Sequence, residues 1–440
     1  MQMSIFKQPV NRKVMITLLV IISLFSIWEM IMGTPKNVQI DTDSHAYLRT
    51  SKLSLLDKGF YINGKVTILF FYKLAHSNPN IIILIQKILY ALASTFLAIS
   101  TLLLIKENLS KSIGFMLVLL FTFWWNIIGW NNIILSESIA HSFLFLWLAT
   151  YILMVKYRSK VIFFFHLIIA LLFAHTRDQW IILMIIFYFI SLAYTYKKNK
   201  FQIKMAVFLF FFAIAVLIGN SYFLLGSKKN SFPLKNVIFQ RILVNDNYLN
   251  WFIKHGMPYN NNFIKWKGAW AGSFNGELTR KPEYDTFNTW VDVNGEKALG
   301  IFIMTHPNYF LKTYLNEVGK TLTYNLFYVR NPPENKLIYF SNKTFPLFNL
   351  SLLFILSLIT VVNIKRTNYH FEFLFPLILI ILSMCNGIIC LHLDPMEIER
   401  HTIANQIFLQ YSGIILFINL ISVVVKPEIY RDPKIDISLK

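Results

Sequence analysis

Long apolar segments alternate with short polar connections along most of the chain. A helix needs about 20 mostly apolar residues to cross the hydrocarbon of a bilayer. The pattern therefore predicts an all-α polytopic membrane protein with about ten transmembrane helices, the fifth and sixth of which are short. The predicted spans are 14–33, 81–105, 113–129, 133–155, 161–175, 180–196, 204–225, 345–364, 371–391 and 403–425.

Composition supports a membrane protein rather than a soluble one. The chain has 440 residues, of which 55% are hydrophobic, and its mean hydropathy is +0.51. Such a chain is too apolar to cover a soluble core with polar surface. The net charge of +20 comes largely from Lys and Arg clustered between apolar segments, so nucleic acid is not predicted as a partner. Cys385 and Cys390 lie in one apolar segment and are interpreted as packing residues.

Basic residues mark every second connection. They precede the first apolar segment and recur in "KENLSK", "KYRSK", "KKNKFQIK", "IKRTNYH" and the tail "KPEIYRDPK". Cytoplasmic loops of membrane proteins carry an excess of Lys and Arg, so both termini are predicted to be cytoplasmic. Richness in Ile, Lys, Asn and Phe is typical of an AT-rich bacterial genome, which indicates the cytoplasmic (inner) membrane of a bacterium.

Two longer connections are predicted on the outer side, at 34–80 and 226–344. The ends of the second read as amphipathic helices, and its middle, "KWKGAWAGSFNGELTRKPEYDTF", is rich in Gly and aromatic residues. We therefore divide the chain into three parts. They are an N-terminal transmembrane bundle with the first outer loop (1–225), an extracytoplasmic loop domain (226–344), and C-terminal transmembrane helices with a cytoplasmic tail (345–440).

Acidic, imidazole and guanidinium side chains collect on the predicted outer side, whereas the cytoplasmic loops offer mainly lysines. Ionisable groups beside lipid are costly unless something uses them, so this one-sided collection predicts a site at the outer membrane boundary. The residues are Asp41, Asp43, His45, Tyr47, Glu137, His141, His175, Arg177, Asp178, His392, Asp394, Glu397, Glu399, Arg400 and His401.

Glu137 and His141 in "LSESIAHSFLF" are four residues apart, which places them on one helical face. They either line the predicted site or form a buried hydrogen-bonded pair that holds helices together. Arg177 in "HTRDQW" and Arg400 in "HLDPMEIERHT" are suited to phosphate, because a planar guanidinium donates two parallel hydrogen bonds and stays charged. The alternatives are a solvated loop for Arg177 and local helix pairs for Arg400.

A metal site is not predicted, although one is not excluded. His392 and Asp394 are ligand types for a divalent metal, but neither residue stands in an HxxxH or DxD spacing. No cofactor is therefore assigned, and a divalent metal is left open.

Several short stretches resemble features of the GT-C superfamily of integral membrane glycosyltransferases, particularly the bacterial relatives of the protein mannosyltransferases and aminoarabinose transferases. Those proteins carry an acidic residue in the first outer loop, in a segment like D-E-x-x-Y-x-x-x-A-x-x-L-x-x-G. Here "DSHAYLRTSKLSLLDKG" supplies Asp43, Tyr47 and Gly59, and "LSES", "HTRDQW" and "THPNYFLKTYL" are also similar to family features. Ser44 stands where many relatives have a second acid. Asp41, which lies three residues earlier, is the nearby carboxylate that would take the place of that acid.

The resemblance implies transfer of a sugar from a polyprenyl-phosphate donor to a hydroxyl of a glycan, lipid or protein acceptor, at the outer face and among membrane lipids. A carboxylate there takes the proton of the attacking hydroxyl, and arginines hold the departing phosphate. The implied roles are base for Asp43, with Asp41 nearby; phosphate binding for Arg177, Arg400, His175 and His401; and site lining for Tyr47, Glu137, His141 and Glu399.

Other functions stay open at this point. A polymerase or ligase of O-antigen or capsule units would also use outer-face arginines. A flippase or transporter of lipid-linked glycans is expected to place charges near the midplane and on both sides, and the sequence shows neither feature. For Asp43 itself the structural alternative is a helix cap, since Asp and Ser are common at N-caps.

Overall fold

The protein is an all-α membrane protein, and all ten predicted apolar segments fall on helices. The computed structural model describes residues 12–34, 37–62, 65–195, 200–224, 231–322, 335–344, 350–364, 371–393 and 398–425. The long bundle helices are α1 (Arg12–Met32), α5 (Pro79–Leu104), α6 (Asn108–Thr122), α8 (Ser136–Tyr157), α9 (Lys160–Ala174), α10 (Asp178–Thr195), α11 (Lys200–Leu224), α19 (Leu350–Ile364), α20 (Phe371–Leu393) and α22 (Ile403–Val425).

Five helices in the described part of the chain are long and apolar enough to cross a membrane. They are Pro79–Leu104, Ser136–Tyr157, Ile203–Ser221, Phe371–His392 and Ile403–Val425. A bent pair, Asn108–Thr122 with Trp125–Asn132, forms a sixth candidate span. Shorter apolar helices occupy Ile16–Met32, Lys160–Ala174, Asp178–Leu192 and Leu352–Val361.

The bend in that pair differs from the single straight span predicted for 113–129. Helix α6 ends at Thr122, whose carbonyl accepts a hydrogen bond from Tyr90 Oη at 2.6 Å. The chain then turns by 53° into α7 (Trp125–Ile128) and the 3-10 helix η2 (Gly129–Asn132). Both short helices are buried except for Asn126, so the "WWNIIGWNN" stretch packs inside the protein and is not an exposed connection.

The first predicted outer loop folds into three short helices, α2 (Thr42–Thr50), α3 (Lys58–Ile62) and α4 (Val66–Leu74). The apolar face of α4 is buried against α5 and α8 through Ile68, Leu69 and Tyr72. The loop is therefore packed onto the bundle and provides a fixed support for the residues that it carries.

Two further short helices, α18 (Lys336–Thr344) and α21 (Ile398–His401), lie outside this loop.

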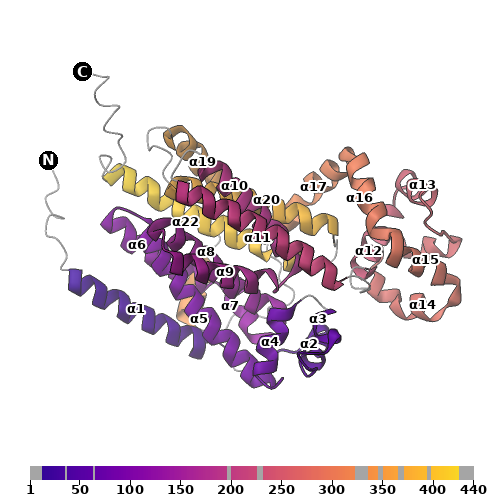
Figure 1. The fold of residues 1–440 in the computed structure, drawn as a ribbon, viewed down its shortest axis with the longest axis horizontal. Helices are drawn as coiled ribbons and strands as arrows, with labels where there is room; N and C mark the ends of the chain where they lie inside the picture. Colours follow the sequence, from indigo (N-terminus) through magenta and orange to yellow (C-terminus); the bar gives the residue numbers. More distant parts are fainter. Residues whose placement is uncertain are drawn as a thin grey trace.

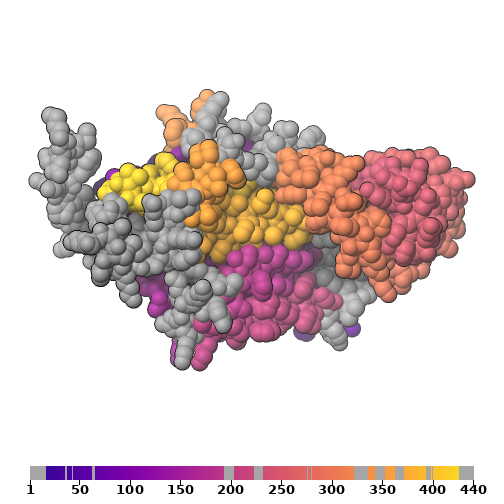
Figure 2. Space-filling view, turned by 90° about the horizontal axis from the view of Figure 1, so that it is seen from above, coloured from indigo at the N-terminus to yellow at the C-terminus, as the bar shows by residue number. Residues whose placement is uncertain are grey.

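Residues 231–322 form a lobe with a hydrophobic core of its own, centred on aromatic side chains such as Phe252, Trp266 and Phe302. Figure 2 shows this lobe, in pink to orange, projecting from one end of the bundle. Its elements are α12 (Ser231–Val237), the π-helix η3 (Ile238–Ile242), α13 (Asp246–Lys254), η4 (Asn261–Trp266), η5 (Ala271–Phe274), α14 (Asn275–Arg280), η6 (Pro282–Tyr284), α15 (Asp285–Trp290), the π-helix η7 (Val291–Gly295), α16 (Glu296–Thr305) and α17 (Pro307–Leu322).

The bundle has two distinct ends (Figure 1). The beginning of α1 and the end of α22 lie together at the left of the view, whereas α12 to α16 extend to the right. Helices α2, α3 and α4 also lie toward the right-hand end. The first loop and the lobe are thus at the end of the bundle opposite to these two helix ends.

Candidate active site

A buried carboxylate, Glu137, is the centre of the polar cluster that the fold assembles. It lies in the first turn of α8, and its side chain is completely buried. Its Oε1 atom is 2.5 Å from Arg400 Nε and 3.5 Å from Arg177 Nη2, and Ser136 Oγ donates to its Oε2 at 3.2 Å. A buried carboxylate is stable only when it is paired and hydrogen-bonded, and the two guanidinium groups supply this pairing.

Arg400 connects the buried carboxylate to an exposed one. Its Nη2 atom is 3.3 Å from Asp43 Oδ2, and the Asp43 side chain is 55% exposed whereas that of Arg400 is 6% exposed. The short helix α21 brings Arg400 to this position between α8 and α2. The guanidinium of Arg400 therefore spans from the protein interior to the surface, where a ligand from outside can reach Asp43.

Arg177 is held by a second partner, His401. The Nη2 atom of Arg177 is 2.7 Å from His401 Nδ1, and the His401 carbonyl accepts a hydrogen bond from Gln179 Nε2 at 3.3 Å. Desolvation, together with the positive charges of Arg177 and Arg400, holds the pKa of His401 well below its usual value. The ring is therefore neutral, and its Nδ1 accepts the hydrogen bond that orients the Arg177 guanidinium.

The segment before α2 is attached to the start of α8, and this attachment positions Asp43. Ser44 Oγ donates to the Ile134 carbonyl at 2.7 Å and accepts from the Asp41 N–H at 2.8 Å. The Gln39 N–H donates to the Asn132 carbonyl at 2.8 Å, and Gln39 forms an isolated parallel bridge with Ile133. Ser44 is buried, and its hydroxyl fixes the loop to the segment before α8.

Lys65 adds a cation that sequence reasoning missed. It immediately precedes α4, donates a hydrogen bond to Tyr47 Oη and lies 4.9 Å from the centroid of the Tyr47 ring. Its charge is close enough to Glu137 to act on that carboxylate. Lys65 is one of several basic residues in the segment 34–80, so nothing in the sequence distinguished it from the others.

Cations outnumber carboxylates among the side chains whose contacts are given above. With His401 neutral, Arg177, Arg400 and Lys65 are the cations, and Glu137 and Asp43 are the carboxylates. A partly buried cluster with excess guanidinium and ammonium charge next to a surface carboxylate is suited to an anionic ligand, phosphate above all. The structure thus brings together residues from α2, α8 and α21 with two residues that precede α4 and α10.

The remaining predicted residues lie around this cluster or outside the part of the chain that the structure describes. His141 is buried one turn beyond Glu137 and has no polar partner among the described residues. The His175 carbonyl accepts a hydrogen bond from the Thr67 N–H at 3.3 Å. Desolvation lowers the pKa of the His175 imidazole. The contacts of Arg177 and Arg400 described above do not include this ring. Asp41 contributes the backbone contacts to Ser44 given above. Glu399 belongs to α21, but its side chain lies outside the described part of the chain.

The described residues contain no group of three or more His, Cys, Asp and Glu side chains arranged to hold a metal ion. His392, one of the two ligand types considered from the sequence, stacks on Phe310 with ring centroids 4.4 Å apart. Asp394 lies outside the described residues.

Comparison with known proteins gives no relative from which a role can be transferred. No family model matches the chain, and no curated protein matches it. The function is therefore inferred from the geometry of the site and from the resemblance of its short sequence stretches.

Proposed function

We propose that the protein is a membrane glycosyltransferase of the GT-C type, which moves a sugar from a polyprenyl-phosphate donor to an acceptor hydroxyl on the outer side of the cytoplasmic membrane. The observation that carries this proposal is the position of Arg400, whose guanidinium contacts both the buried Glu137 and the exposed Asp43. A phosphate binder and an accessible base thus lie side by side, as sugar transfer from a lipid phosphate requires.

In the proposed reaction the oxygen of the acceptor hydroxyl attacks the anomeric carbon of the sugar, and Asp43 accepts the proton of that hydroxyl. A new glycosidic bond forms, and the bond from the anomeric carbon to the phosphate oxygen breaks. Arg400, Arg177 and Lys65 stabilise the negative charge that develops on the departing polyprenyl phosphate. The 55% exposure of Asp43 supports its access to an acceptor, and its distance of 3.3 Å from Arg400 supports a base and a phosphate binder that act together.

Glu137 has a different role in this proposal. It is fully buried and contacts both arginines, so it holds their guanidinium groups in place but has no access to an acceptor. The sequence left open whether Glu137 lines the site or stabilises the bundle. We propose that it does both, because the pairing that makes its charge tolerable also orients the phosphate binders.

The proposed topology has ten transmembrane helices, with both termini in the cytoplasm and the lobe outside. The five long spans, the bent pair and the four shorter apolar helices together account for ten. The arrangement of the two bundle ends supports it, because the start of α1 and the end of α22 lie opposite to the lobe (Figure 1). Shorter apolar helices cross a bilayer when flanking residues or local thinning accommodate the mismatch.

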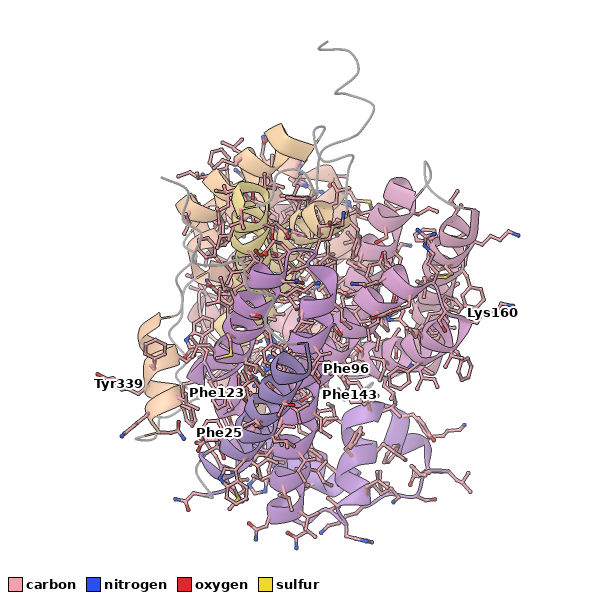
Figure 3. All side chains as sticks on the ribbon, turned by 90° about the vertical axis from the view of Figure 1, so that its left-hand side faces the viewer. Phe25, Phe96, Phe123, Phe143, Lys160 and Tyr339 are labelled. Atoms are coloured by element: carbon pink, nitrogen blue, oxygen red, sulfur yellow. The ribbon has the colours of Figure 1, made fainter. Side chains whose placement is uncertain are left out.

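We expect cysteines introduced at Leu56 and Val293 to react with a membrane-impermeant thiol reagent added to intact cells, and a cysteine at Lys160 to react only after permeabilisation. Leu56 is 95% and Val293 is 72% exposed, in the first loop and the lobe. Figure 3 views the bundle from the end opposite to the lobe. Lys160 is labelled in this view, and its side chain points outward from the bundle. The background is a variant in which Cys385 and Cys390 are alanine. Labelling at Lys160 in intact cells would contradict the orientation.

Two alternatives make different demands on the same residues. An O-antigen or capsule polymerase or ligase also forms a glycosidic or ester bond next to a lipid phosphate, and it differs from the proposal in the acceptor and donor that it uses. A flippase or transporter moves a lipid-linked glycan without making or breaking a bond. Such a transporter needs the cations for attraction only, so it tolerates lysine in place of arginine.

Replacing Arg400 with lysine is expected to lower kcat/KM for transfer at least tenfold. An ammonium cannot keep the contacts to Glu137 and Asp43 and also bind a phosphate through two parallel bonds, so at least one charge-assisted bond is lost. Such a bond contributes about 1.5–3 kcal/mol. The measurement compares purified wild type, Arg400→Lys and, as a matched control, Arg280→Lys, which changes an exposed arginine in the lobe. Equal efficiency for all three would remove the phosphate-binding role.

A further inference from the structure

Helix α17 joins the lobe to the transmembrane bundle. Near its start the Phe310 ring stacks on His392 at the end of α20, with ring centroids 4.4 Å apart. Near its end the Thr321 carbonyl accepts from Asn405 Nδ2 at 3.4 Å, and a Cβ added at Gly387 would lie 3.3 Å from Thr321 Oγ1. Gly387 is about 7 Å along the helix axis from His392. Helix α17 therefore crosses α20 within the length of the candidate span Phe371–His392.

The side of α17 that faces away from the bundle carries an apolar stripe. Leu311 is 54% exposed and Leu315 is 69% exposed, and the half-buried Val318 follows at the next position of the same helical face. Met304 in the preceding helix α16 is 76% exposed. Large apolar side chains that are both strongly exposed and aligned mark a surface that another apolar partner covers.

A second stripe of α17 is polar. Lys312, Asn316 and Lys320 are exposed and recur every four residues, next to the leucine stripe. The bundle-facing side is different again, because Tyr309 and Thr321 are buried. A helix with one side packed on protein, one apolar side and one cationic side has the pattern of a helix that lies at the boundary between lipid and water.

The bundle helix against which α17 packs has an exposed apolar surface of its own. Helix α20 exposes Ile381 and Met384, at 44% and 54%, within a candidate membrane span. Because α17 packs against this same helix, it lies along a candidate membrane span that exposes apolar side chains. Acyl chains are the one partner that must be present along the whole outer surface of a transmembrane bundle.

We propose that α17 is an interfacial helix, whose stripe of Leu311, Leu315 and Val318 contacts the acyl chains of the bilayer while Lys312 and Lys320 lie among the lipid headgroups. The lobe is thereby seated on the membrane surface instead of standing free in water. This inference rests on the membrane character of the bundle and does not depend on the proposed reaction. Since α17 also packs against α21, the helix of Arg400, the same contact holds the arginine cluster near headgroup depth.

The test uses a fluorescent thiol label at Leu315→Cys, with Asn316→Cys as the matched control on the polar stripe. Both variants are made in the full chain with Cys385 and Cys390 replaced by alanine, and are placed in nanodiscs of phosphatidylcholine and phosphatidylglycerol. Two quenchers are compared, a lipid that carries a nitroxide near the top of its acyl chain and iodide in the water. Each variant is used only if its thermal unfolding midpoint matches that of the cysteine-free protein, and Leu311→Cys replaces Leu315→Cys if it does not.

The label at position 315 is expected to lose fluorescence to the nitroxide lipid and to be shielded from iodide, with the reverse result at position 316. Quenching of both labels by iodide to the same extent would overturn the proposal, because the stripe would then face water. A label at position 315 that neither quencher reaches would also overturn it, since protein would then cover the stripe. Failure of these tests leaves the transfer assays unaffected, so the two proposals are judged separately.

Discussion

Replacing Glu137 with alanine is expected to destabilise the protein by about 3–5 kcal/mol, the usual cost of removing one partner from a buried ion pair. The change leaves the guanidinium groups of Arg177 and Arg400, both about 6% exposed, without the carboxylate between them. The measurement is the thermal unfolding midpoint of the purified protein in detergent. A midpoint equal to that of wild type would show that Glu137 does not hold the site together.

A second substitution separates charge from packing at this position. Glu137→Gln keeps the shape of the side chain but removes its charge, so it is also expected to be destabilising. Adding Arg177→Met to Glu137→Gln removes one of the two uncompensated cations, and part of the lost stability should return, since residues in one ion-pair network are energetically coupled. A double variant that is less stable than Glu137→Gln by the full cost of Arg177→Met alone would contradict the coupling.

Asp43→Asn is expected to lower the rate of sugar transfer by about 10²–10⁴-fold, the usual contribution of a positioned general base. Asparagine keeps the size of the side chain but cannot take the proton of the acceptor hydroxyl. Stability should change by less than about 1 kcal/mol, because the Asp43 side chain is 55% exposed and Arg400 keeps its contact with Glu137. Transfer is followed in membranes or purified protein with a polyprenyl-linked sugar, and the unfolding midpoint is recorded beside it.

Asp41→Asn is the matched control for this variant. Asp41 lies two residues away in the same loop, and its backbone is held by Ser44, so its replacement should have a milder effect on transfer. Near-normal turnover of Asp43→Asn would remove its assignment as the base. A larger loss for Asp41→Asn than for Asp43→Asn would move that assignment to Asp41.

Sequence periodicity predicted the helices well, because each apolar run is a local feature. All ten apolar segments fall on helices, although the bend after Thr122 was not predicted. That bend depends on tertiary contacts, such as the hydrogen bond from Tyr90 to the Thr122 carbonyl. The sequence predicted a loop domain over 226–344 but not which side chains form its aromatic core, since residues such as Phe252 and Phe302 come from distant segments.

Sequence reasoning named residues that lie together in the structure, but it did not predict which of them form pairs. Sequence reasoning placed Asp43, Glu137, Arg177 and Arg400 at one boundary, and the structure brings them into one cluster. It did not predict that Glu137 pairs with both arginines, because Glu137 and Arg400 are 263 positions apart and nothing local fixes their contact. Ser44 was interpreted as a missing acid, whereas its buried hydroxyl attaches the loop to the segment before α8.

Formation of a covalent product by the purified wild-type protein tests the central proposal most directly. The protein is incubated with a polyprenyl phosphate that carries a radiolabelled sugar and with candidate glycan, lipid and protein acceptors, beside the Asp43→Asn variant. The account predicts that label moves to an acceptor while free polyprenyl phosphate is released, and that both products are lost in the variant. Movement of the intact labelled lipid across reconstituted vesicles, with no bond made or broken by either protein, would contradict it and favour a transporter.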